Sequence, residues 1–180
     1  MDRDGFWELI DRARLRAGGD AEGTVAAAGE MLAGLAAEEI IAAQQVLWDQ
    51  LAASYVAPLW AAAYLINGGC SDDGFDYFRG WLVVQGREVF ERAVGHPDWL
   101  AEYSAVREAA GEWEELECES TLGIAYGAYR RVTGESIPQG SWSIRYPALG
   151  GEYWFDFSDS ERLHRMLPRL AALYGKPAAA

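Results

Sequence analysis

The chain has few of the residues on which metal centres and nucleophilic active sites depend. It contains two cysteines, Cys70 and Cys118, and two histidines, His96 and His164. So few cysteines cannot form a disulfide framework or a zinc finger. A catalytic cysteine normally needs a nearby base, and the histidines that could serve are equally scarce. The chain also lacks a Walker loop, a dinucleotide-binding fingerprint and a Gly-x-Ser-x-Gly elbow, so the common nucleotide-binding and hydrolase sites are not expected.

Long hydrophobic runs are missing as well. No stretch approaches the ~20 apolar residues that a membrane-spanning helix requires. The richest stretch, residues 55–66, contains Pro58 and is followed by Asn67, Gly68 and Gly69. The first residues do not form a basic region followed by an apolar one, so no secretory signal is expected. We therefore expect a cytoplasmic protein with reduced thiols and no membrane association.

Basic residues are outnumbered by acidic ones. The chain has 15 Lys and Arg against 28 Asp and Glu, and a formal net charge of −13. This balance disfavours direct binding to the phosphate backbone of a nucleic acid. Many of the acids lie in one short segment, at Glu112, Glu114, Glu115, Glu117 and Glu119. That segment is either an ordinary solvated face or a surface for a basic protein partner.

The hydrophobic pattern predicts a mainly α-helical fold. Hydrophobic residues make up 51% of the chain, enough for a sizeable core. They recur at helical spacing in successive segments, with Asp4 and Asp20 as expected N-caps and Gly134 as an expected stop. We expect one compact multi-helix domain over residues 1–175 and a frayed tail over 176–180.

Two details of this expected fold concern glycine and proline. Gly123 and Gly127 lie four residues apart on one face of an expected helix, which indicates close helix packing in a protein without membrane spans. Residues 135–158 are rich in proline, glycine, serine and aromatics, so this segment is expected to be a long ordered loop or a short hairpin before the C-terminal helix. Ser158 and Glu161 have the spacing of a capping box for that helix, which Pro168 should interrupt.

The most unusual stretch is "INGGCSDDGFDYFRGWLVVQG", residues 66–86. Asn67 and Gly68 can end one helix, and Ser71 followed by Asp72 can begin the next. Acids in a first helical turn also interact favourably with the helix dipole. The alternative is a divalent cation site, because helical spacing brings Asp76 beneath Asp72 and Asp73, and carboxylates bind Mg²⁺ or Ca²⁺. Capping is the simpler interpretation, and no bound metal or other cofactor is expected.

Arg79 is the residue of this motif that capping does not explain. The helix around it is apolar nearly all round, and a buried arginine needs a partner. One interpretation is an internal ion pair with an aspartate of the motif. The other is a ligand-binding pocket in which Arg79, Asp72 and Asp73, covered by Trp81 and the loop at 135–157, grip a small anionic ligand.

The motif also contains the candidate catalytic residues, which are Cys70, Asp73 and Asp76. A helix N-terminus can lower the pKa of a thiol and make it nucleophilic. The acids that follow Cys70 oppose formation of a thiolate, so an inert cysteine is the preferred interpretation. Asp73 or Asp76 could act as a general base if burial set its pKa.

Several segments together carry a family resemblance. "GFWELID", "LWAAAYLINGGCSDDGFDYFRGWLVVQG" and "HPDWLAEY" resemble the bacterial DUF4240 domain, and "YWFDFSDSERL" and "LPRLAALYG" are similar to its C-terminal part. The resemblance implies that residues 67–86 are the defining element of the family, and it implies no reaction or cofactor. The helix ending in "NGG" before a Phe-x-x-Phe pattern is also similar to small acidic DNA-mimic proteins of the DMP19 type. That second likeness implies binding to a basic partner.

These observations favour an intracellular binding or regulatory module. It would act through a pocket at residues 67–86 or through an acidic face, and its partner would be a basic protein or a small anionic ligand. The alternative is a small enzyme or ligand-binding domain in which Asp72, Asp73, Asp76 and Arg79 bind an anionic or metal-linked substrate. The sequence is compatible with both hypotheses. It indicates no particular oligomeric state.

Overall fold

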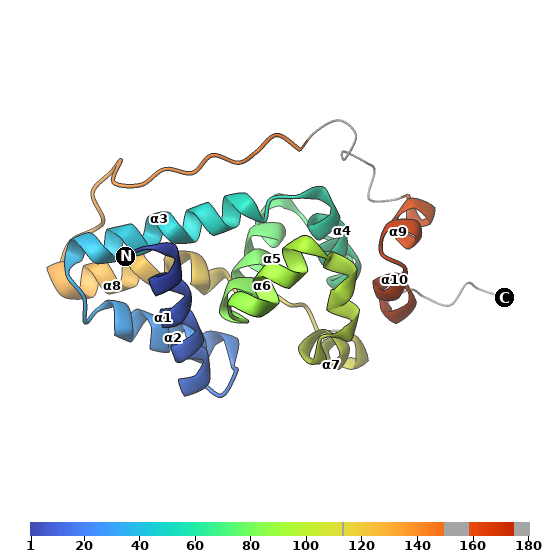
Figure 1. Cartoon of the computed structure of the whole chain (residues 1–180), viewed down its shortest axis with the longest axis horizontal. Coiled ribbons are helices and arrows are strands. Elements are labelled where there is room, and N and C mark those ends of the chain that lie inside the picture. Colours follow the sequence, from blue (N-terminus) through green and yellow to red (C-terminus); the bar gives the residue numbers. More distant parts are fainter. Residues whose placement is uncertain (113, 150–158, 175–180) are drawn as a thin grey trace.

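The computed structural model describes residues 1–112, 114–149 and 159–174. Four helices form one end of the molecule (Figure 1): α1 (Arg3–Arg16), α2 (Ala21–Leu32), α3 (Ala37–Ala53) and α8 (Ile124–Thr133). Helix α1 packs on α2, and α8 packs on both α2 and α3. The long helix α3 extends from this group toward the other end of the molecule (Figure 1).

The remaining helices form the other end, around α5. They are α4 (Ala57–Ile66), α5 (Asp72–Val84), α6 (Arg87–Gly95), α7 (Ser104–Glu112), α9 (Ser160–Met166), α10 (Pro168–Tyr174) and two 3₁₀ helices, η1 (Pro97–Glu102) and η2 (Glu119–Gly123). Helix α5 contacts α1, α2, α3, α4 and α6, and packs closely on η2. The prediction of a compact, mainly α-helical fold is confirmed, and the described residues contain no β-strand.

Close packing of α5 depends on Gly80. A Cβ atom at this position would lie 2.5 Å from the carbonyl oxygen of Cys118 and 3.3 Å from Cβ of Thr121. The backbone of the segment before η2 therefore touches the backbone of α5, which only glycine permits here. The amide of Cys118 also donates a hydrogen bond to the carbonyl of Tyr77, at 3.0 Å.

The observed helix ends match the predicted ones where the prediction rests on a single capping residue. Asp20 accepts a hydrogen bond from the amide of Gly23 at 2.6 Å, and Gly134 ends α8 in the left-handed conformation with φ of 76°. The predicted start of α1 is wrong by two residues, because Asp2 and not Asp4 is the N-cap. Asp4 lies in the first turn, where its charge is also favourable.

The C-terminal helices are held by a cap from far along the chain. Asp98 of η1 accepts hydrogen bonds from the amides of Arg169 and Leu170, both at 3.0 Å, and so caps the start of α10. The expected interruption at Pro168 is confirmed. The cap of α9 is Asp159; Ser158 of the expected capping box and the expected tail at 176–180 lie outside the described residues.

Between α8 and α9 the chain runs without helix or strand through the described residues 135–149. We call residues 141–149 the strap. It runs as an extended trace alongside α3, from the end of the molecule where α8 terminates toward α4 (Figure 1). The alternative of a hairpin is not seen in this described part, which is a loop in contact with α3.

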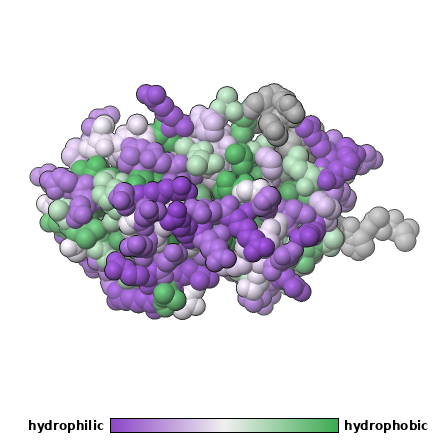
Figure 2. All heavy atoms as spheres, in the orientation of Figure 1, coloured by the Kyte–Doolittle hydropathy of each residue, from purple (hydrophilic) through white to green (hydrophobic). Residues whose placement is uncertain are grey.

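The surface offers no large apolar face in the view of Figure 2. That face is mainly hydrophilic, and hydrophobic residues reach it in several separate patches. In the described part of the chain, no helix is both long and apolar enough to cross a bilayer.

Candidate functional site

The start of α5 is a capped helix N-terminus. Ser71 is the N-cap, and its hydroxyl accepts a hydrogen bond from the amide of Gly74 at 3.1 Å. Asp72 and Asp73 lie in the first turn and are exposed. Asp76 points instead toward Arg79, and no group of three acidic, histidine or cysteine side chains in the described residues could hold a metal ion. The geometry is that of a cap, with Asp76 separated from the other two acids by its ion pair.

Arg79 is fully buried and is bound by the protein itself. Its guanidinium forms an ion pair with Asp76, whose side chain is 30% exposed. It also donates to two carbonyl oxygens, that of Leu51 near the end of α3 and that of Phe75 at 3.2 Å. A cation at the C-terminal carbonyls of a helix is favourable for the helix dipole. Arg79 thus links α5 to the end of α3, which is the arrangement expected of an internal ion pair.

Aromatic rings enclose the same guanidinium. Its central carbon lies 4.5 Å from the ring centroid of Phe75 and 5.2 Å from those of Tyr55 and Tyr146. Cation–π contacts of this kind stabilise an arginine that has lost its water. Trp81 does not cover this group, since its ring packs against Phe78 and Tyr103 on another side of α5.

Cys70 is half-buried beside the start of α5. Burial, and then the negative charge of Glu117, raise the pKa of Cys70 to about 12. The thiol is therefore protonated at neutral pH, which removes the thiolate that nucleophilic catalysis requires. This is the arrangement of the inert cysteine favoured by the sequence.

The structure brings together two acidic segments that are far apart in the sequence. The side chain of Asn67 accepts a hydrogen bond from the amide of Leu116 at 3.0 Å, which fixes residues 115–119 against the start of α5. A carboxylate oxygen of Glu117 comes within 3.3 Å of the position that a Cβ of Gly74 would occupy. We call the resulting surface the acidic face. Its members are Asp72, Asp73, Glu115, Glu117 and Glu119.

The carboxylates of the acidic face influence one another and their neighbours. Burial and then Glu115 raise the pKa of Glu117, and Asn67 opposes this shift. Burial raises the pKa of Tyr77, and the charges of Glu119, Asp73 and Glu117 raise it further. In the described part of the chain, no arginine or lysine forms an ion pair with any member of this face. The sequence shows each acidic segment but not their proximity, which comes from the turn at Asn67.

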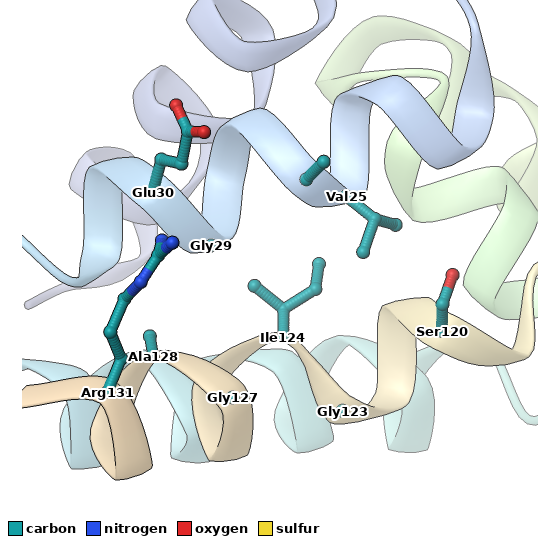
Figure 3. Close-up of a pocket in the computed structure, with 10 residues that line it drawn as sticks. Val25, Gly29, Glu30, Ser120, Gly123, Ile124, Gly127, Ala128 and Arg131 are labelled. Carbon is teal, nitrogen blue, oxygen red and sulfur yellow. The ribbon is translucent and has the colours of Figure 1, made fainter.

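A groove between α2 and α8 corrects the prediction for the paired glycines. A Cβ atom at Gly123 or Gly127 would meet no other atom within 4 Å, so these glycines do not mark a close helix contact. They line an open groove of about 420 Å³, in which Val25 and Ile124 face each other (Figure 3). The prediction of close packing is therefore wrong. A four-residue spacing of glycines does not distinguish a packed helix face from an open one.

Comparison with known proteins adds a family. The family model DUF4240, described as a protein of unknown function, matches residues 1–131. The chain belongs to this family. The DUF4240 match spans α1 to most of α8 and contains the whole of the motif at 66–86, and it ends before the strap, α9 and α10. The C-terminal part of the resemblance therefore lies outside it. No curated protein and no solved structure matches the chain, and the likeness to DNA-mimic proteins is not supported.

Proposed function

We propose that this DUF4240 protein is a non-catalytic binding module that recognises a basic segment of a protein partner through the acidic face. The observation that carries the proposal is the convergence of five carboxylates from two segments without a compensating cation among the described residues. Like charges brought together cost folding free energy unless a partner neutralises them. A positively charged ligand relieves that cost and is attracted from a distance.

The contrast with other acids of the chain supports this assignment. Asp4, Glu91 and Glu102 are exposed, and each forms an ion pair with an arginine. Arginine neutralises these three surface acids, whereas no ion pair to a member of the acidic face occurs among the described residues. The acidic face keeps its negative charge, and Tyr77 beside it offers an aromatic ring on which an arginine or lysine can stack.

Three of the groups that a catalytic role would use are engaged within the protein or protonated, and the fourth, Asp73, is exposed on the acidic face. Arg79 donates to three protein acceptors, Asp76 is its ion-pair partner, and the pKa of Cys70 is about 12. A binding role requires none of these groups. It requires only the exposed carboxylates and the rigid connection through Asn67 that holds them in place.

The experiment compares two variants of equal net charge. A fluorescently labelled arginine-rich peptide is titrated with each protein, and its anisotropy is followed. The face variant carries Glu115→Gln, Glu117→Gln and Glu119→Gln. The control variant carries the same change at three exposed glutamates of α1 and α3, namely Glu8, Glu38 and Glu39. We expect the face variant to bind about tenfold or more weakly, a loss of roughly 1.4 kcal/mol. Equal weakening in both variants would mean that the peptide senses net charge and not this face.

A further inference from the structure

A second recognition surface lies beneath the strap, on the side of α3 that faces it. Gln45 of α3 makes a reciprocal pair of hydrogen bonds with the backbone of Ser143. Its amide nitrogen donates to the carbonyl of Ser143, and its carbonyl oxygen accepts from the amide of Ser143, both at 2.9 Å. The same amide nitrogen donates to Asp49 at 2.8 Å, which orients the group. A side-chain amide bound in this way recognises an extended backbone whatever its side chains.

Two aromatic contacts flank this pair of hydrogen bonds. Trp142 of the strap stacks on Trp48 of α3, with centroids 5.1 Å apart and planes at 22°, and meets Tyr126 of α8 edge-on at 6.2 Å. Tyr146 of the strap packs on Tyr55 at 4.6 Å. Trp48 lies on α3, and Tyr55 follows shortly after α3 ends at Ala53, so the two aromatic contacts meet the strap at successive places. We call this surface the strap groove, formed by Gln45, Trp48, Tyr55 and Tyr126.

The backbone of the strap makes few hydrogen bonds to the groove, and the strap is held mainly by its side chains Trp142 and Tyr146, the second of which also contacts Arg79. In the described part of the chain, Ser143 is the one strap residue whose backbone hydrogen-bonds to the helices beneath. Ser143 itself and residues 145–148 are exposed. A segment with few buried contacts and an exposed backbone opens locally at low free energy. The strap is therefore the kind of segment that a competing ligand displaces.

The strap also leaves part of the surface unfilled. An open groove of about 540 Å³ adjoins Trp48 and Tyr126, the two rings that Trp142 contacts. An open pocket of about 350 Å³ lies at the other end beside Tyr55, and Pro147, Ala148 and Leu149 of the strap form part of its wall. A ligand with more side-chain volume than the strap would fill space that the strap leaves open.

The DUF4240 match includes the residues of the strap groove and ends before the strap that covers them. All four residues of the strap groove lie within residues 1–131, which the DUF4240 model matches, and the strap lies beyond it. We propose that the strap groove binds an extended segment of a partner protein with two aromatic side chains four residues apart, and that the strap is its internal competitor. This proposal does not rest on the one made for the acidic face, although the two surfaces adjoin at Glu119, which lines the groove beside Trp48 and Tyr126.

The test uses the full chain and a peptide that copies the strap. Trp142→Ala with Tyr146→Ala removes both anchors and opens the groove. The probe is a labelled peptide with the sequence of residues 140–149, and a scrambled peptide is the control. We expect the opened variant to bind the probe at least tenfold more tightly than the wild type, because a tethered competitor acts at an effective concentration of about millimolar. Adding Gln45→Ala to the opened variant should reduce binding by a further factor of about ten.

Several results would overturn the proposal. One is the absence of probe binding to the opened variant at millimolar concentration, and another is equal binding of the scrambled peptide. Retention of binding with Gln45→Ala would show that the amide does not recognise the backbone. Dimerisation of the wild type that the probe cannot reverse would instead indicate exchange of straps between two copies. Hydrogen exchange of the wild type gives a check without substitutions: strap amides as protected as those of α3 would exclude a displaceable cover.

Discussion

Replacing Arg79 by methionine tests the role assigned to the motif at 66–86. The substitution keeps an unbranched apolar stem and removes the guanidinium. It leaves the carbonyl of Leu51 without its charged donor and Asp76 without its ion-pair partner. Removing one partner of a fully buried pair costs about 3–5 kcal/mol. Because Asp76 is 30% exposed and stays partly hydrated, we expect the lower end of that range, about 3 kcal/mol.

The assay is urea unfolding followed by circular dichroism, with thermal unfolding beside it. For a chain of this size, a loss of 3 kcal/mol corresponds to a decrease in Tm of about 6–12 °C. Arg107→Met is the matched control, since Arg107 is exposed and forms no ion pair with the described residues. It should change the free energy of unfolding by less than about 0.5 kcal/mol. In the double variant with Asp76→Asn the two losses should not add, with a coupling of about 0.5–3 kcal/mol.

A neutral or stabilising effect of Arg79→Met would refute this reasoning. Residues kept for ligand binding are commonly not at the optimum for stability, so their replacement often leaves the fold unchanged or more stable. Such a result would mean that the guanidinium is held for a ligand, and the ligand-binding alternative would regain its central residue.

Two further predictions concern the surroundings of α5. The alkylation rate of Cys70 by iodoacetamide should still be rising above pH 9, where the rate of an ordinary thiol levels off, because the pKa of Cys70 is about 12. Glu117→Gln should lower this pKa and speed the reaction at pH 8. An unchanged rate would contradict the effect assigned to the charge of Glu117. Gly80→Ala should destabilise the fold by about 1–3 kcal/mol, since its Cβ would meet the carbonyl of Cys118 at 2.5 Å. Gly127→Ala should stabilise α8 by up to about 1 kcal/mol in the same urea titration, because a Cβ at Gly127 meets no atom within 4 Å. Equal effects of the two alanine substitutions would refute the close contact at Gly80.

The sequence predicts those parts of the fold that depend on neighbouring residues. Asp20, Ser71 and Gly134 are found at the helix ends where their local chemistry places them. The difference at α1 has the same origin, because Asp2 and Asp4 are both suitable caps and the local sequence does not choose between them. Such ambiguities move a helix boundary by about two residues without changing the fold.

Features that depend on long-range packing could not be predicted. A buried arginine at position 79 requires a partner, and the sequence offers three nearby aspartates; the carbonyl of Leu51, 28 residues away, has no signal in the sequence. The acidic face depends on the contact between Asn67 and Leu116, which are 49 residues apart. The cap that Asp98 gives to Leu170 of α10 spans a longer separation, 72 residues. Each of these contacts joins residues that are far apart in the sequence, so it forms only when the chain folds and leaves no local pattern in the sequence.

The most direct test of the proposed function is the salt dependence of peptide binding. Log Kd for the arginine-rich peptide is measured against log salt concentration for the wild type, the face variant and the control variant defined above. If the acidic face is the binding surface, the slope for the face variant should fall by most of its value while that of the control variant follows the wild type. Identical slopes for the face and control variants would contradict the claim that the carboxylates gathered around the start of α5 form a recognition surface.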